Sequence, residues 1–141
     1  MRRILMERSF FHQHLQFSRS FTKKLNEQLA EVGLYHSQWL LIYYLKEFET
    51  ATLVDISNYL DVEKPTITRT VNRLEERGLI RKVPSKDRRE RRIGLTEKGN
   101  EVYGEAGKVV KSFEQSLMEG MQETEIVSTI RTIQLLKKKL N

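Results

Sequence analysis

The sequence predicts a mainly α-helical fold with one small β-hairpin, and three observations support this. Apolar residues recur at helical spacing through most of the 141 residues. Strict alternation of apolar and polar residues is confined to two short runs, LIRKVP and RRIGLT, which flank the turn-rich SKDR. The excess positive charge falls in that same part of the chain. These features favour helices packed around one core, with a basic hairpin attached.

The first predicted helix runs from Ile4 to Leu29 and should end at Gly33, whose tolerance of positive φ suits a helix C-terminus. Its apolar stripe consists of Leu5, Phe11, Leu15, Phe21, Leu25 and Leu29. A second helix should open at His36 or Ser37 and continue through SQWLLIYYLKEF. Because that segment leaves little polar surface, the second helix is predicted to be buried.

Two short helices should follow the break ETAT. The first contains Leu53, Ile56 and Leu60 and ends at Asp61 and Val62. The second begins near Pro65, which fits a first helical turn, and Gly78 terminates it. Its apolar stripe is formed by Ile67, Val71 and Leu74. A step of about 100° per residue then places the following residues on the opposite side or its flanks: Pro65, Thr66, Arg69, Asn72 and Arg73.

The two alternating runs predict an antiparallel hairpin with arginines at its tip and on its return strand. Two short helices followed by a basic hairpin is the order of a winged helix-turn-helix, in which the hairpin is the wing. Helical spacing resumes at Thr96, where TEKG resembles a capping box with Gly99 in place of the preferred Glu. A last helix should begin at Thr124.

The terminal helices carry more apolar surface than a small winged domain could cover, which predicts a homodimer. The surplus residues include Phe11, Leu15, Phe113, Leu117, Ile130 and Leu136. We therefore expect one continuous unit over residues 1–141. Within it, residues 1–34 and 100–141 form a helical dimerisation region and residues 35–99 form the winged helix.

Residues 62–99 hold twelve Lys or Arg and six Asp or Glu, and this excess equals the chain's whole net charge of +6. A charge run can be only a solvated face. The location of this one, on a helix that could enter the major groove and on an adjoining wing, favours a double-stranded DNA partner. The alternative is a winged helix that docks another protein without binding DNA.

Several classes of site find no support in the sequence. There is no cysteine, and no apolar run is long enough to span a membrane, so we expect a cytoplasmic chain. The rings of His12 and His14 would point about 200° apart on a helix, and His36 stands alone, so no metal site is predicted. No nucleophile, base and orienting group occur together, and no phosphate-binding glycine loop is present. We predict no cofactor and no enzymatic activity.

The segment LVDISNYLDVEKPTITRTVNRLEERGLIRKVPSKDRRERRIGLTEKG, with VGLYHSQWLLIYYL before it, resembles the MarR family of bacterial winged-helix transcription regulators. The family's wing signature is matched by Asp87, Arg89, Leu95, Thr96 and Gly99. The resemblance implies a ligand-responsive homodimer that acts as a repressor or activator, and of these we expect a repressor at a palindromic operator. It further implies that Arg89 enters the minor groove while Asp87 orients it.

We assign candidate DNA contacts to two segments. Those on the recognition helix are Lys64, Pro65, Thr66, Thr68, Arg69, Asn72 and Arg73, and those on the wing are Lys86, Asp87, Arg88, Arg89 and Arg91. The aromatic residues permit two interpretations. They can be core, or Phe11, Trp39 and Tyr43 can line a pocket for a small aromatic effector, as the resemblance suggests.

Overall fold

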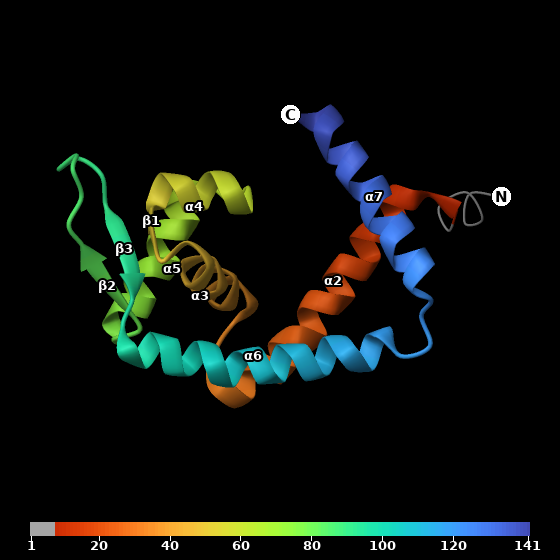
Figure 1. The fold of residues 1–141 in the computed structure, drawn as a ribbon, viewed down its shortest axis with the longest axis horizontal. Helices are drawn as coiled ribbons and strands as arrows, with labels where there is room; N and C mark the ends of the chain where they lie inside the picture. Colours follow the sequence, from red (N-terminus) through yellow and green to blue (C-terminus); the bar gives the residue numbers. More distant parts are fainter. Residues whose placement is uncertain (1–7) are drawn as a thin grey trace. The chain divides into compact units, whose positions relative to one another are not determined.

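The computed structural model describes residues 8–141, which are mostly helical (Figure 1). In chain order the elements are α2 (Phe10–Leu29), the short 3-10 helix η1 (Ala30–Val32), α3 (His36–Phe48), β1 (Thr50–Thr52), α4 (Leu53–Leu60), α5 (Lys64–Glu76), β2 (Ile80–Val83), β3 (Arg92–Leu95), α6 (Glu97–Met118) and α7 (Glu123–Leu140). The chain divides into two compact units, one ending at Val110 and the other spanning Lys111–Asn141.

The predicted first helix is interrupted at Ser9, between the helical residue Arg8 and the start of α2. Ser9 has an extended backbone, and its hydroxyl accepts a hydrogen bond from the backbone N–H of His12, so α2 begins at Phe10. The part of the prediction before Arg8 lies outside the described residues. The other end is confirmed, because Gly33 closes η1 in the left-handed conformation with φ 71°.

The sheet has three strands, in the order β1-β3-β2, where the sequence predicted two. The predicted hairpin is present as β2 and β3, with Lys82 opposite Ile93. The break predicted at ETAT is a short strand, β1, which pairs antiparallel to β3 with Ala51 opposite Ile93. Three residues are too few to show an alternating pattern, so only the pairing with β3 reveals this strand.

The core of the first unit lies where the C-terminal end of α2 meets α3, α4, α5, the sheet and the first half of α6. Its most completely buried side chains are Leu29, Leu41, Ile42, Leu45, Ile56, Val71, Leu74, Leu79 and Ile93. The predicted stripe of α5 accounts for two of them, and the apolar α3 for three. Burial of these side chains, at about 25 cal/mol per Å², supplies the main force that holds α5 against its support.

A junction around Thr96 connects the end of α5 to the end of β3. The Thr96 hydroxyl donates to the carbonyl of Gly78 at 2.6 Å, and the Thr96 N–H donates to the carbonyl of Leu79 at 3.1 Å. The same hydroxyl accepts from the N–H of Gly99 at 3.0 Å and so caps α6. We call these three bonds the Thr96 junction.

Gly99 is required by this geometry. A Cβ built at Gly99 would lie 2.1 Å from the Leu79 carbonyl oxygen, which no side chain could tolerate without backbone movement. The glycine that made the predicted capping box imperfect therefore has a steric reason. It lets α6 start directly against the strand end that the Thr96 junction holds.

The second unit contains the last part of α6 and all of α7. No residue of α7 is buried, and Val127, Ile130, Leu135 and Leu140 are each at least half exposed. Gly120, with φ 80°, separates the two helices. Among the described residues, no helix is both long enough and apolar enough to cross a membrane.

We predict that Gly99→Ala destabilises the protein by about 1–3 kcal/mol, the usual cost of overpacking, because the new methyl group meets backbone. Gly104→Ala is the matched control, since it lies in the same helix with nothing within 4 Å of a built Cβ. That control should gain about 0.5–1 kcal/mol from helix propensity. Urea unfolding measures both, and equal effects of the two substitutions would contradict the steric account.

Candidate nucleic-acid interface

The helix α5 presents polar and basic side chains to solvent along its whole length. Ile67, Val71 and Leu74 are buried, as predicted. Lys64, Pro65, Arg69, Asn72 and Arg73 are exposed, and Thr66 and Thr68 are partly so. All seven predicted recognition-helix residues therefore lie on the accessible surface of one helix, where a ligand could reach them.

The accessible surface of α5 has two flanks on either side of its exposed ridge. With Ile67 set inward, Thr66, Arg69, Thr70 and Arg73 fall on one flank, which we call the arginine flank. Lys64, Thr68, Asn72 and Glu75 fall on the other, which we call the wing flank because Glu75 contacts the wing. The two flanks therefore have different neighbours.

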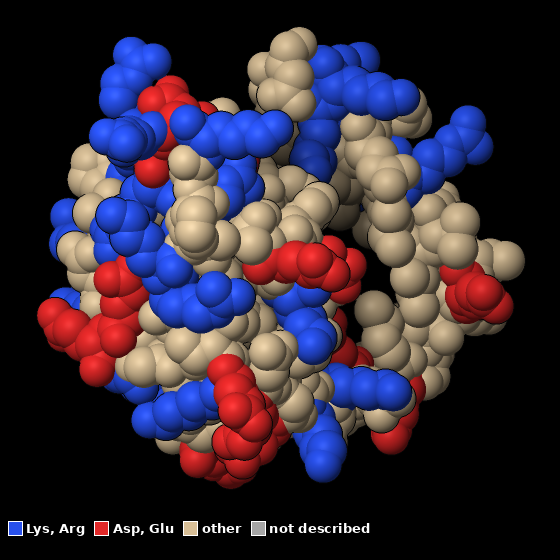
Figure 2. All heavy atoms as spheres, turned by 60° about the vertical axis from the view of Figure 1, so that its left-hand side comes forward, with Lys and Arg blue, Asp and Glu red and all other residues tan. Residues whose placement is uncertain are grey.

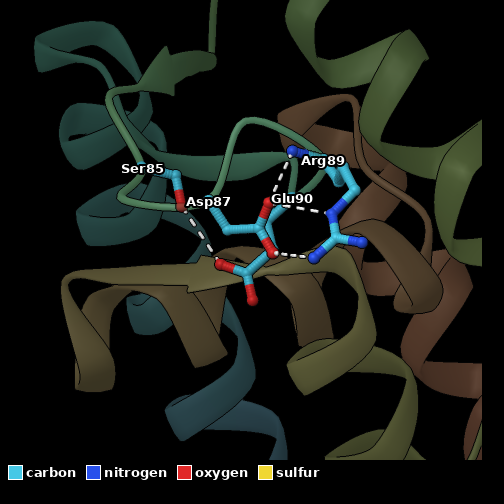
Figure 3. Close-up of polar contacts among 4 residues, drawn as sticks. All are labelled: Ser85, Asp87, Arg89 and Glu90. Carbon is cyan, nitrogen blue, oxygen red and sulfur yellow. Dashed lines mark hydrogen bonds and ion pairs between the residues drawn. The ribbon is translucent and has the colours of Figure 1, made fainter.

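The tip of the wing holds one arginine in a fixed geometry (Figure 3). The Asp87 carboxylate accepts hydrogen bonds from the Arg89 backbone N–H at 2.9 Å, from Nε at 3.2 Å and from Nη2 at 3.3 Å. The Arg89 side chain is nevertheless 92% exposed. A cation that is both exposed and oriented is suited to insertion into a narrow groove.

The Asp87 carboxyl is kept ionised by the same contacts. The backbone N–H of Arg89, followed by its guanidinium, lowers the pKa of Asp87 below its usual range. The turn is closed by two further bonds, from the Glu90 N–H to the Asp87 carbonyl at 3.1 Å and from the Ser85 hydroxyl to the Glu90 carboxylate at 3.1 Å. The loop is thus organised by its own side chains.

An ion pair fastens the wing to α5. The guanidinium of Arg91 lies 2.8 Å from the carboxylate of Glu75, and both side chains are 32% exposed. On β3, the guanidinium of Arg92 also donates to the hydroxyl of Thr50 at 3.2 Å, which ties the wing to β1. Arg91 is therefore placed at the base of the wing, while Lys86, Arg88 and Arg89 are exposed toward its tip.

The charge distribution on this face matches the prediction from sequence. Figure 2 shows Lys and Arg side chains gathered at the upper left of the view, with a few acidic side chains among them. Glu75 and Asp87, two of the acidic groups in this region, are already paired with Arg91 and Arg89. The cations left over create an attractive potential for a polyanion.

A polar pocket lies between the arginine flank of α5 and the first turn of α3. It has a volume of about 180 Å³ and is lined by Tyr35, Ser37, Gln38, Thr66, Arg69, Thr70 and Arg73. We call it the α3–α5 pocket. A neighbouring, more open hollow of about 410 Å³ shares Tyr35, Ser37 and Arg73 with it. No acidic side chain lines either one.

The three aromatic residues predicted to form an effector pocket are not brought together. Trp39 is buried and Tyr43 is half exposed, with their ring centroids 5.8 Å apart, and Tyr103 stacks on Trp39 at 5.6 Å. Phe11 lies near the start of α2, about 20 Å along the helix from the Leu25 end that joins the core. Its described ring contact is with Phe10.

The described residues include no cluster of three or more His, Cys, Asp or Glu placed to hold a metal ion. His36 opens α3, and its backbone N–H donates to the Asn26 side chain at 2.7 Å. Burial lowers the pKa of the His36 imidazole, so the neutral ring is favoured at neutral pH.

Several residues that shape this surface were not singled out from the sequence as part of it. Glu75 positions the wing, and Ser37 and Gln38 line the α3–α5 pocket. Arg77 donates to the carbonyl of Gly33 at 2.8 Å and so ties the end of α5 to the end of η1. Their roles depend on pairings between segments that are distant in sequence.

Comparisons with known proteins agree with this architecture. A model of the MarR family matches residues 34–90. The HTH-type transcriptional regulator YwoH of Bacillus subtilis is 40% identical over 113 residues, which are 80% of this chain and 82% of that protein. An HTH-type transcriptional regulator of Staphylococcus aureus is 30% identical over 97% of this chain and 99% of its own length.

Solved structures share the fold. The MarR protein of Staphylococcus aureus, in complex with salicylate and kanamycin, superimposes with a TM-score of 0.83 over 96% of this chain and 93% of that one, at 26% identity. The MepR–DNA complex of the same organism superimposes with a TM-score of 0.85 over 96% and 99%, at 20% identity.

We predict that the Glu75–Arg91 ion pair contributes about 0.5–1 kcal/mol, because it is only partly exposed. A double-mutant cycle of Glu75→Ala and Arg91→Ala, read by urea unfolding, measures this coupling. The exposed pair Lys24–Glu27, at 3.4 Å with side chains 65% and 54% exposed, is the control and should show almost none. If the two cycles gave the same coupling, the wing would not be fastened by this pair.

Proposed function

The chain belongs to the MarR family of HTH-type transcriptional regulators, and on that basis we propose that it binds a palindromic operator in duplex DNA as a homodimeric repressor. One observation carries the proposal most directly. The guanidinium of Arg89 is 92% exposed at the tip of the wing, yet the Asp87 carboxylate fixes its direction. An unliganded protein has no evident structural need for such an arrangement.

In this proposal α5 lies in the major groove. Its first turn, with Lys64, Pro65 and Thr68 exposed or partly exposed, approaches the base edges while Ile67 and Val71 anchor the helix to its support. Asn72, one turn further along the wing flank, can donate and accept hydrogen bonds in the plane of an adenine edge. The 13-residue length of the helix is ample for a major-groove contact.

The wing supplies the second contact. A narrow minor groove concentrates negative potential, which favours an inserted arginine, and Asp87 reduces the entropy that Arg89 would otherwise lose on insertion. Lys86 and Arg88 are exposed on the same loop and are placed to neutralise neighbouring phosphates. Arg91 acts through Glu75, by holding the wing at a fixed distance from α5.

A second copy of the chain would cover the apolar surface of the terminal helices. Phe11 is 62% exposed and Leu15 is 52% exposed on α2, and Ile130 is 50% exposed on α7. Burying side chains of this kind about a two-fold axis would place two α5 helices for an inverted repeat, with half-sites about 10 base pairs apart. Sedimentation equilibrium tests this, since a chain that stays monomeric at micromolar concentration would contradict it.

We further propose that a small aromatic acid modulates DNA binding. Support comes from the relative in Staphylococcus aureus that was solved with salicylate and from the Trp39, Tyr43 and Tyr103 cluster, where an aromatic ligand could stack. Titration of Trp39 fluorescence with salicylate measures it, and an unchanged spectrum at millimolar salicylate would contradict it. In this role the chain acts on cytoplasmic DNA without catalysis.

We predict a steep salt dependence of DNA binding. If each subunit neutralises about four phosphates, a dimer has about eight contacts and a log–log slope on the order of −7. The duplex can be selected by repeated binding from a random pool, and fluorescence anisotropy between 50 and 300 mM salt, roughly the range in which such contacts weaken, gives the slope. A slope near zero for every duplex would instead favour a winged helix that docks protein.

We predict that Asp87→Asn weakens binding to the selected duplex by about tenfold, although it raises the net charge. Simple electrostatics predicts the opposite, because removing a negative charge should tighten binding to a polyanion. Loss of the carboxylate frees Arg89 and removes its preorganisation. Glu90→Gln is the control, because it adds the same charge on the same loop and leaves the Asp87–Arg89 contact unchanged. If both variants bound more tightly, Asp87 would have no positioning role.

A further inference from the structure

We propose that the α3–α5 pocket binds an oxyanion of the phosphate class, which in the operator complex is a backbone phosphate. Arg73 would then be a phosphate contact and not a reader of bases. The inference rests on the proposed DNA-binding function and assigns different tasks to the two flanks of α5.

The pocket offers hydrogen-bond donors and positive charge from two separate elements. Arg69 and Arg73 project from α5, and the hydroxyl of Ser37 and the amide of Gln38 come from the first turn of α3. The α3 helix is 13 residues long, and its N-terminal dipole adds a partial positive charge to the same place. Because no Asp or Glu lines the pocket, nothing in its lining would repel an anion.

Gln38 provides a hydrogen-bond donor that is available to a ligand in the pocket. Its side chain is only 6% exposed, and its Oε1 accepts a hydrogen bond from the Tyr35 backbone N–H at 3.0 Å. Since an N–H can only donate, this contact fixes the amide so that Nε2 is the remaining donor. No described residue accepts from that Nε2. The Nε2 atom is not fully buried, so an oxyanion in the pocket could accept a hydrogen bond from it.

The neighbouring hydroxyls are compatible with the same ligand. Thr70 donates to the Thr66 carbonyl at 3.0 Å, and Arg69 donates through Nη2 to the Thr66 hydroxyl at 3.2 Å. These contacts hold Arg69 against the helix and leave Arg73, whose side chain makes no hydrogen bond or ion pair with the described residues, to reach the ligand. A volume of about 180 Å³ holds an oxyanion together with some water, since one water occupies about 30 Å³.

The position of the pocket also argues against base reading by Arg73. Arg73 lies about two and a half turns beyond the N-terminus of α5, beside the first turn of α3. Side chains that read bases come mostly from the first turns of a recognition helix, whereas phosphates line the groove edges that flank it. A phosphate held between α3 and α5 would set how deeply α5 enters the groove.

The first experiment titrates the free protein with inorganic phosphate against chloride at constant ionic strength, with NMR detection of the Gln38 side-chain amide and the Ser37 backbone N–H. We expect saturable shifts at these two groups. Gln38→Glu, which has no side-chain amide to detect, should abolish the shift of the Ser37 N–H, because it keeps the acceptor for the Tyr35 N–H and replaces the donor with a negative charge. Arg73→Gln should do the same if Gln38→Glu fails to fold. Lys108→Gln, which removes an exposed positive charge on α6, is the control and should leave the shifts unchanged.

The second experiment measures Arg73→Gln on the selected duplex and on a random duplex of equal length. A phosphate contact predicts equal weakening, of about tenfold or more, on both duplexes, with a salt slope shallower by about two per dimer. Duplex should also compete with inorganic phosphate for the pocket. If phosphate bound without such competition, the occupant would be a free anion and not a backbone phosphate. The inference is overturned if phosphate causes no saturable shift and Arg73→Gln weakens only the selected duplex. Phosphate binding without any duplex binding would leave the anion site intact and contradict only the DNA-binding function.

Discussion

The Thr96 junction is the constraint on which the arrangement of this surface depends. One threonine side chain donates to the carbonyl of Gly78, just beyond α5, and accepts from the N–H of Gly99 at the start of α6. The Lys98 ammonium adds a bond to the Arg77 carbonyl at 3.1 Å. The four residues Thr96–Gly99 therefore connect three elements. These are the end of α5, the return strand of the wing and the start of α6. Carbonyls that a helix end would otherwise leave to water are satisfied here by Thr96 and by Lys98 of α6.

Several contacts besides the Thr96 junction fix α5 and the wing to one another. The Glu75–Arg91 ion pair repeats the connection on the wing flank, and the Arg92 contact to Thr50 extends it to β1. Preorganisation of this kind lowers the entropy lost when both elements engage a duplex together. The arginine flank is constrained separately, by α3. A rigid support with two differently surrounded flanks allows one flank to position the protein and the other to read sequence.

The sequence predicted those features that depend on local patterns. The α5 stripe of Ile67, Val71 and Leu74, the αL residue Gly33 and the hairpin around SKDR are all confirmed, because each follows from spacing or from one residue's conformational preference. Ser9 was missed because the apolar pattern continues across it. Strand β1 was missed because its three residues are defined only by pairing with β3. The sequence also could not tell that the Leu25 end of α2 joins the core, and the effector pocket with Phe11 and Trp39 stays a prediction.

For the interface, the sequence identified the residue types and the element that carries each, whereas their partners came from the fold. Arg91 and Arg89 are equivalent in a charge count, but one is paired with Glu75 and the other is held outward by Asp87. Gln38 lies in an apolar helix and had no signal of its own. Its role in the proposed site depends on its Nε2 atom, which has no acceptor among the described residues. This atom lies in the same pocket as Arg69 and Arg73 of α5, which is distant in sequence.

Native-state hydrogen exchange tests the central claim, that the recognition helix and the wing form one rigid element through the Thr96 junction. The amides of Thr96 and Gly99 should exchange only by the opening that also exposes the amides of the buried residues Val71 and Leu74, with the same free energy and the same urea dependence. The amides at the wing tip around Arg88 should exchange far faster. If Thr96 and Gly99 exchanged as rapidly as the tip, through a local opening insensitive to urea, the wing would move independently of α5 and the account would be contradicted.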